Sequence, residues 1–232
     1  MSRITLLSIA VLSVVTGCAN PRPNPPDELQ NFDVPPQVIY RIDDHRFVSL
    51  ENYRDCQHGT TYYNDTRQKI RTKLGTDSIE NFRGRLINAD PSGRYIVIPS
   101  SEPPRRSCPE RGCNIGFIYS TDGGRSFSSG GVYMRDTWQP YEDSANFIVA
   151  AAGDRIYIAE KWGSRDYYVV QYPLFPGIDF RKKYAPEDYP PGVRGDRFAA
   201  STRPDYLKGL RTPSGQEYLS CDNSIRPAEP PR

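Results

Sequence analysis

Short β-favouring runs separated by turn residues recur along most of this chain. The runs at 94–98 and 115–119, for example, have five residues each and are rich in Ile and Tyr. Runs of this length, bounded by Gly, Asp and Pro, are typical of strands and too short for stable helices. The chain is therefore predicted to be mainly β: an antiparallel meander, propeller-like or sandwich-like, with one or two short helices and a loop-rich C-terminal part.

Some local patterns are more specific. The turn Asp90-Pro91-Ser92-Gly93 between β-rich arms predicts a hairpin of 82–89 with 94–98. Ile70 and Leu74 are four residues apart before a Gly, which predicts a short helix over 64–74. The remaining strands are expected at 37–42, 45–53, 60–63, 115–119, 132–134, 146–150, 155–159 and 167–172. Returning prolines predict a long ordered loop over 173–204, with a short helical turn at 204–207.

The N-terminus has the form of a secretory signal. Arg3 precedes an apolar run over 4–15 that is too short to span a bilayer, and small residues then lead to Cys18. This ending resembles the bacterial lipobox, so residues 1–17 are predicted to be a lipoprotein signal peptide and Cys18 the lipidated N-terminus. Ala19 follows, rather than the aspartate of inner-membrane retention, which favours an outer-membrane anchor facing the periplasm. The alternative is an ordinary signal peptide with a nearby cysteine.

Residues 18–36 follow as a Pro-rich tether. Six prolines and no apolar periodicity predict an extended, partly polyproline segment up to about 56 Å long. The domain prediction is thus a signal peptide at 1–17, the lipidated Cys and tether at 18–36, a single β-rich domain at 37–226 and a disordered tail at 227–232.

Four cysteines remain once Cys18 is set aside. An even number in an exported protein indicates disulfides, with three possible connectivities. The short loop between Cys108 and Cys113 contains Pro and Gly, which favours joining these two and leaves Cys56 with Cys221. A zinc site is the competing interpretation, but the spacing lacks paired C-x-x-C or histidine motifs.

The segment from Ser120 to Phe127 matches most of the Asp-box found in hairpins of sialidase-like β-propellers. Its residues suit a structural turn: the Asp122 carboxylate can accept N–H bonds, Gly124 can take a positive φ, and Phe127 can pack beneath. About 190 residues would hold roughly four propeller blades. The motif leaves open a sialidase-like or glycan-handling envelope enzyme.

No motif supplies catalysis. No nucleophile elbow, zinc-protease helix, phosphate loop or EF-hand occurs, so neither catalytic residues nor a cofactor nor a metal site is predicted, and no small-molecule substrate is expected. Lys and Arg number 30 against 28 Asp and Glu, with the charges interspersed, which offers no argument for nucleic acid. The protein is expected to contact a membrane only through its lipid anchor.

Aromatic residues mixed with charges are the remaining signal. Trp and Tyr beside Arg and acids are typical of protein-binding hot spots, although about half of such aromatics pack in cores. The predicted partner-binding residues are Trp138, Tyr141, Trp162, Arg165 and Tyr167.

Several short motifs together resemble a known family. They include Val38 to Arg46, Glu51 to Cys56, Phe82 to Ile96, Tyr119 to Phe127 and Tyr189 to Asp196. Over about 37–225 the chain resembles Tli-type immunity proteins of the third lipase class of type VI secretion systems. The resemblance implies a periplasm-facing lipoprotein that binds and neutralises a phospholipase effector by occluding its active site, and it carries over no catalytic residues. A structural envelope lipoprotein without a toxin partner is a further alternative.

Overall fold

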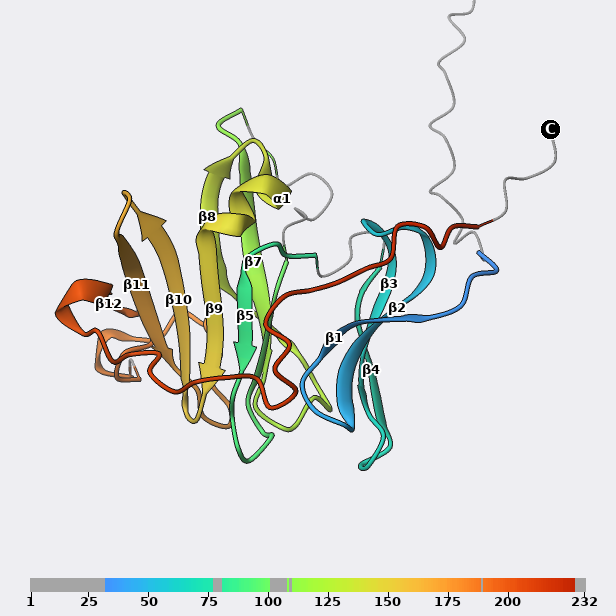
Figure 1. The fold of residues 1–232 in the computed structure, drawn as a ribbon. Helices are drawn as coiled ribbons and strands as arrows, with labels where there is room; N and C mark the ends of the chain where they lie inside the picture. Colours follow the sequence, from blue (N-terminus) through green and yellow to red (C-terminus); the bar gives the residue numbers. More distant parts are fainter. Residues whose placement is uncertain (1–31, 77–80, 101–107, 109, 189, 228–232) are drawn as a thin grey trace, which may run out of the picture. The chain divides into compact units, whose positions relative to one another are not determined.

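A computed structural model of the protein describes residues 32–76, 81–100, 108, 110–188 and 190–227. The chain divides into two units, 1–30 and 31–232, and all the described residues belong to the second. The predicted signal peptide, Cys18, most of the tether and residues 228–232 therefore lie outside the described residues. The mainly β prediction is confirmed, because the described residues form three sheets with only short helical turns (Figure 1).

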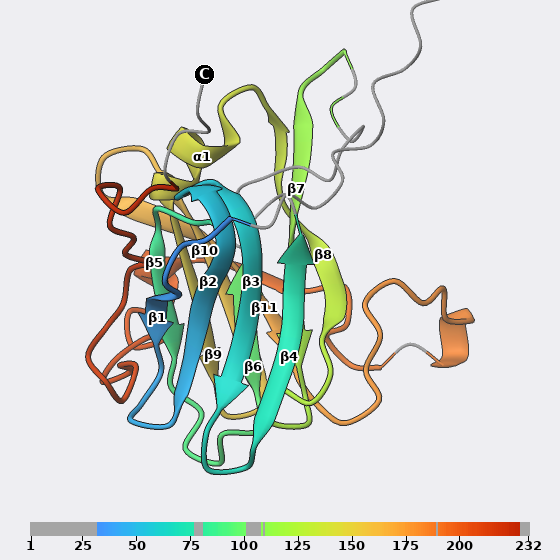
Figure 2. The ribbon, with the colours of Figure 1, turned by 90° about the vertical axis from the view of Figure 1, so that its right-hand side faces the viewer.

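The first sheet is a four-stranded antiparallel meander in the order β1-β2-β3-β4. Its strands are β1 (Gln37–Arg41), β2 (Arg46–Asp55), β3 (His58–Asp65) and β4 (Ile70–Thr76). In Figure 2 this sheet stands in front of strands from the other two.

The helix predicted over 64–74 is wrong, because these residues end β3, turn and form β4. The Asp65 carboxylate accepts the Gln68 N–H at 2.9 Å, and Lys69 closes the turn at a φ of 56°. Ile70 and Leu74 both pack against the core from the strand. A spacing of four residues fits one face of a helix and one face of a strand equally, so the turn decided between them.

The second sheet has five strands in the order β12-β11-β10-β9-β5, and the third has three in the order β6-β7-β8. The strands of the second are β5 (Arg85–Asn88), β9 (Phe147–Ala152), β10 (Arg155–Trp162), β11 (Asp166–Pro173) and β12 (Asp196–Ala199). Those of the third are β6 (Ile96–Pro99), β7 (Cys113–Ser120) and β8 (Ser128–Thr137). The helical elements are α1 (Pro140–Asp143) and the 3-10 turns η1 (Ser144–Asn146), η2 (Pro186–Asp188) and η3 (Ala200–Thr202).

The predicted hairpin of 82–89 with 94–98 is also wrong, although its turn forms. β5 pairs in parallel with β9, and β6 pairs antiparallel with β7, so the two arms belong to different sheets. The Asn88 side chain links them instead, accepting the Val97 N–H at 2.8 Å and donating to the Val97 carbonyl at 3.0 Å. These two hydrogen bonds of the buried Asn88 amide hold the two arms together in place of a strand ladder.

A single large core joins the three sheets. It contains Tyr40 and Tyr63 from the first sheet, Val149 from the second and Phe117 and Tyr119 from the third, all buried. A smaller cluster of Ala159, Val169 and Phe198 lies apart from it in the second sheet.

The Asp-box-like segment fastens the third sheet to the first. Asp122 accepts the backbone N–H of Ser126 at 3.0 Å and its hydroxyl at 2.6 Å, and the Ser120 hydroxyl accepts the Gly124 N–H at 2.8 Å. Burial raises the pKa of Asp122, but the hydrogen bonds from Ser126 and Ser120 outweigh it and leave that pKa below its ordinary value. Phe127 packs on Tyr63 of β3 with ring centroids 5.7 Å apart.

We expect Gly124→Ala to destabilise the protein by about 2 to 3 kcal/mol. Gly124 has a φ of 85°, and an added Cβ would lie 2.0 Å from Cε1 of the buried Tyr63 ring. Gly131→Ala is the matched control, because Gly131 has no atom within 4 Å of the added Cβ. Urea denaturation of both variants measures the difference, and equal midpoints would contradict the docking role of this turn.

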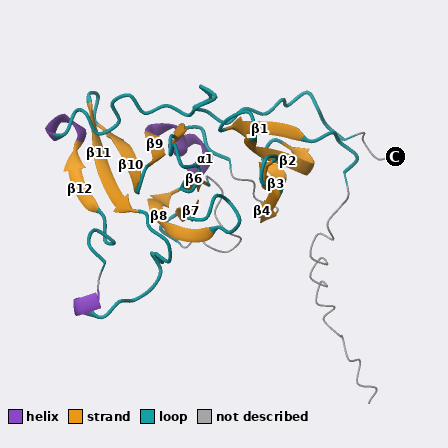
Figure 3. Cartoon of the chain, turned by 90° about the horizontal axis from the view of Figure 1, so that it is seen from below, coloured by secondary structure: helices purple, strands orange, loops and turns teal. Residues whose placement is uncertain are grey.

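The C-terminal strap, defined as residues 212–222, runs from the second sheet toward the first (Figure 3). It hydrogen bonds to β1 through Ser220 N to the Ile39 carbonyl at 2.8 Å, and to β5 through Leu86 N to the Glu217 carbonyl at 2.7 Å. A disulfide between Cys56 and Cys221 fixes its end, and a second joins Cys108 to Cys113 before β7. Both disulfides join the pairs that the sequence favoured.

The region predicted as one loop over 173–204 also contains β12, which pairs with β11. Hydrogen-bonded turns occupy 204–209 where a helical turn was expected, and the 3-10 turn η3 comes just before them. At the other end, residues of the expected tether are already held by the folded body, since Phe32 N donates to the Asn52 side chain at 2.6 Å and Tyr53 donates to the Pro35 carbonyl at 3.0 Å.

Candidate partner-binding cleft

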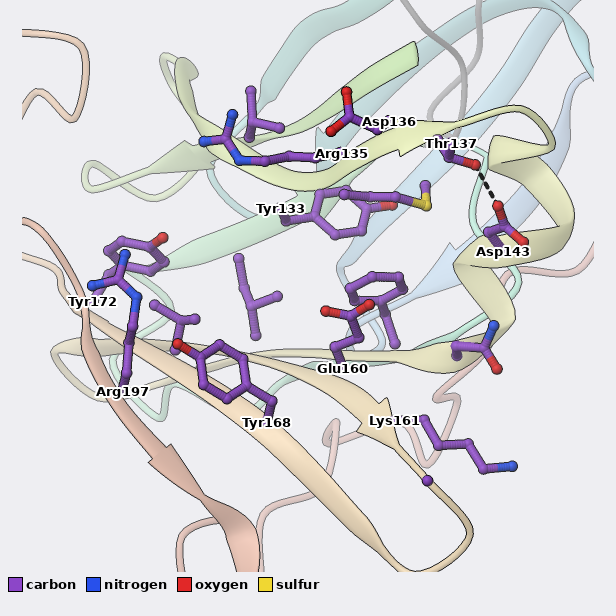
Figure 4. Close-up of a pocket in the computed structure, with 17 residues that line it drawn as sticks. Tyr133, Arg135, Asp136, Thr137, Asp143, Glu160, Lys161, Tyr168, Tyr172 and Arg197 are labelled. Atoms are coloured by element: carbon purple, nitrogen blue, oxygen red, sulfur yellow. Dashed lines mark hydrogen bonds between the residues drawn. The ribbon is translucent and has the colours of Figure 1, made fainter. Parts of the chain in front are cut away.

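An open cleft of about 760 Å³ lies between the third sheet and the second (Figure 4). One wall is the end of β8, and the other is the face of β10 and β11 with Arg197 of β12; Asp143, Asn146 and Phe147 close one end. Its volume falls in the range of about 300–1,000 Å³ typical of ligand sites. The lining is strongly polar, in contrast to an ordinary apolar ligand pocket.

The cleft begins at the point along β10 where its inward-facing side chains stop packing in the core. Side chains alternate along a strand, so Ile156, Ile158, Glu160 and Trp162 share one face. The two isoleucines are buried in the large core, whereas Glu160 is exposed and Trp162 is 65% exposed. The face of β10 therefore changes from packed core to open surface at Glu160.

Glu160 is the central acid of the cleft. Burial raises the pKa of its carboxyl group, and within the described part of the chain the carboxylate has no hydrogen-bond or ion-pair partner. Its neighbours across the sheet are Tyr168 of β11 and Phe147 of β9. An exposed carboxylate without a partner is a group that an incoming cation can pair with.

Positive charge gathers away from Glu160. Burial raises the pKa of the Tyr172 phenol, and the nearby guanidinium groups of Arg197 and Arg135 oppose that shift. Figure 4 shows these three residues at one end of the cleft, with Asp143 at the other and Glu160 between. Thr137 at the end of β8 donates a hydrogen bond to Asp143. Two arginines therefore lie at one end of the cleft, and Glu160 and Asp143 lie toward the other, where Lys161 also lines it with its ammonium group pointing away from Glu160.

Three of the predicted partner-binding residues stand beside the cleft. Trp162 lines a small adjoining hollow together with Glu160 and Tyr168, and Arg165 is exposed in the turn that follows β10. Trp138 comes directly after Thr137 of the cleft wall and is 69% exposed. Trp162 is thus a large apolar side chain on the rim of a polar cleft, and Trp138 is an exposed one next in the chain to a lining residue.

The other two predicted residues lie elsewhere. Tyr141 of α1 carries the Arg83 guanidinium 5.5 Å from its ring centroid and lines a separate cavity of about 370 Å³ with Tyr218. Tyr167 is half-buried and packs on the smaller cluster, on the opposite face of β11 from Tyr168. Their role in partner binding stays a prediction.

Sequence reasoning missed Glu160, Tyr172, Arg135 and Arg197 as members of one site. Arg197 lies on β12, a strand that the sequence did not predict. In the sequence, Arg135 is only one of the charges interleaved with the aromatic residues, Tyr172 is only the end of the strand predicted at 167–172, and Glu160 falls just outside the strand predicted at 155–159. The usable signal was the position of Glu160, which directly follows the strand predicted at 155–159 and comes two residues after Ile158.

The Asp-box-like turn has a structural role in the described part of the chain. The Asp-box-like turn lines a hollow of about 470 Å³ with Arg94 and Arg125, yet the Asp122 carboxylate is occupied by its own turn. Among the residues that the structure describes, no cluster of His, Cys, Asp or Glu could hold a metal ion. No helix in the same residues is long and apolar enough to cross a membrane.

Comparison with known proteins agrees with the resemblance seen in the sequence. No curated protein matches the chain. The family model described as T6SS Tli3 immunity protein matches residues 32–160, which include the first sheet, the third sheet and β10 up to Glu160. Since this match covers more than half of the chain, the protein belongs to the Tli3 family of type VI secretion system immunity proteins.

Proposed function

We propose that this immunity protein binds a cognate type VI lipase effector, a phospholipase, and neutralises it by covering its active site. The family shows that the protein is an immunity protein, which implies a cognate effector as its partner. The lipase class follows from the resemblance of the many short motifs noted above. The observation that carries the mechanism is the polar cleft with exposed Trp162 on its rim and exposed Trp138 directly after its lining residue Thr137.

This rim has the composition of a binding hot spot. Both tryptophans are exposed, and Trp, Tyr and Arg dominate measured hot spots. A stable interface buries about 1,600 Å² in total, so contacts centred on the cleft would extend well beyond it over β8, α1 and the β10–β11 turn. A body of this size seated on a lipase can close the path of a phospholipid to the catalytic centre.

The proposed location is the periplasmic side of the outer membrane. It is supported by the lipobox-like ending at Cys18 and the Pro-rich segment after it. The two disulfides suit an oxidising compartment. Metabolic labelling with a lipid precursor should label the wild type and not Cys18→Ala.

We also propose that the protein acts without catalysis. His58 and Cys56 lie close in sequence, but Cys56 is in a disulfide and His58 contacts Asp55 at 2.7 Å. The internal hydrogen bonds of the Asp-box-like turn account for that motif structurally, which removes the observation that favoured a sialidase-like enzyme.

The test is a titration of the oxidised protein into the lipase-like effector encoded beside its gene. Calorimetry would measure affinity and stoichiometry, and phospholipase activity would be followed in the same samples. Tight binding with loss of activity is expected. Binding with full activity would contradict occlusion, and no binding between two folded proteins would contradict the assignment of this effector.

A further inference from the structure

We propose that the cleft receives a loop of the effector carrying a lysine or arginine whose cation pairs with Glu160. The proposal rests on the proposed function, because it states the chemistry of the partner at that site. It concerns the residues inside the cleft, whereas the tryptophans lie on its rim.

The first support is the state of Glu160. Its carboxylate lies at the point where the buried face of β10 opens, and it has no partner among the residues described. Its side chain is exposed, so a cation of the partner can reach it. A carboxylate held in this way by the sheet is pre-organised to accept hydrogen bonds from an ammonium or guanidinium group.

The second support is the charge pattern of the cleft. Arg135 and Arg197 lie at the Tyr172 end, with Asp136 next to Arg135 in the chain, and Asp143 lies beyond Glu160 at the other end. Lys161 also lines that second end, but its ammonium group points away from Glu160. This arrangement favours a loop with its cation at Glu160 and an acidic side chain toward the two arginines. Opposed charges of this kind fix register and exclude wrong partners.

The third support is the aromatic lining. Tyr133, Tyr168 and Tyr172 border the cleft, and Tyr133 is held edge-on against Phe147 with ring centroids 5.1 Å apart. Tyrosine rings attract cations over their faces and cover the apolar stem of a long basic side chain. The lining thus suits lysine or arginine better than a compact inorganic cation.

The exposed tryptophans favour a protein, not a small molecule, as the occupant of the cleft. A small ligand would fill the interior and leave Trp138 and Trp162, which are 69% and 65% exposed, in water. A protein loop brings its flanking surface over both. The effector is the partner that the family supplies.

The experiment compares Glu160→Gln with Glu187→Gln, an exposed glutamate that is not among the cleft residues. Each variant and the wild type are titrated by calorimetry into a catalytically inactive form of the effector encoded beside the gene, at low and at high salt. Glu160→Gln should weaken binding about ten- to thirtyfold. It should also reduce the salt dependence of the affinity, and Glu187→Gln should change neither.

Stability provides a second readout. Because Glu160 is unpaired in the free protein, Glu160→Gln should leave the urea midpoint unchanged or raise it, which a structural role for Glu160 would not allow. Wild-type affinity in Glu160→Gln would overturn the cleft proposal while leaving the immunity function intact. Failure of the wild type itself to bind would overturn both.

Discussion

The double variant Trp138→Ala/Trp162→Ala should bind the effector about a thousandfold more weakly than the wild type. A hot-spot tryptophan contributes about 2 kcal/mol or more, and each 1.4 kcal/mol is a factor of ten in affinity. Both side chains are mostly exposed in the free protein, so removing them should change the free energy of unfolding by less than about 0.5 kcal/mol. Calorimetric affinity and urea denaturation measure the two quantities separately.

Val38→Ala is the matching control for this experiment. Val38 is 40% exposed on β1, in the first sheet. The substitution therefore removes exposed apolar surface away from the cleft. Its affinity should equal that of the wild type. If the double tryptophan variant also bound with wild-type affinity, the rim would not be part of the interface, and the effector would have to contact another face.

Removing the Cys56–Cys221 disulfide should cost about 4 to 5 kcal/mol of stability. The bridge joins residues separated by 165 positions, and the chain-entropy model assigns long loops the largest effect. The variant Cys56→Ser/Cys221→Ser also frees the strap that completes the hydrogen bonding of β1. Urea denaturation of the oxidised wild type and of the variant gives the difference.

The second disulfide serves as the comparison. Cys108 and Cys113 are only five positions apart, so Cys108→Ser/Cys113→Ser should cost about 2 kcal/mol in the same model. Equal losses in the two variants would show that loop length does not govern the effect. A loss below about 1 kcal/mol on opening the longer bridge would show that the hydrogen bonds of the strap hold it without the disulfide.

The sequence predicted the fold class and most strands because turn residues and β-rich runs act locally. Prediction from the sequence failed where the pairing of a strand depends on a partner far away along the chain. The run at 85–88 looked like the first arm of a hairpin, but its ladder partner is β9, about 60 residues later. The Ile70 and Leu74 pair could not distinguish helix from strand until the Asp65 turn was seen.

The site was predictable only at its rim. Exposed tryptophans near turns are a local signal, and Trp138 and Trp162 stand where that signal placed them, at the surface. The interior of the cleft joins β8, β10, β11 and β12, so it depends on how two sheets meet. Tyr167 and Tyr168 illustrate the limit, because adjacent residues of one strand face opposite sides and only the register tells which side is open.

The strap also sets when the protein can finish folding. The carbonyl of Ile39 receives its bond from Ser220, and Asp222 N donates to the Gln37 side chain at 2.8 Å, so the first strand is completed only by nearly the last described residues. Such long-range closure makes folding slow. In a chain that folds after export, as the proposed periplasmic location implies, the free edge of β1 stays open to pairing with other chains until the C-terminal end has arrived.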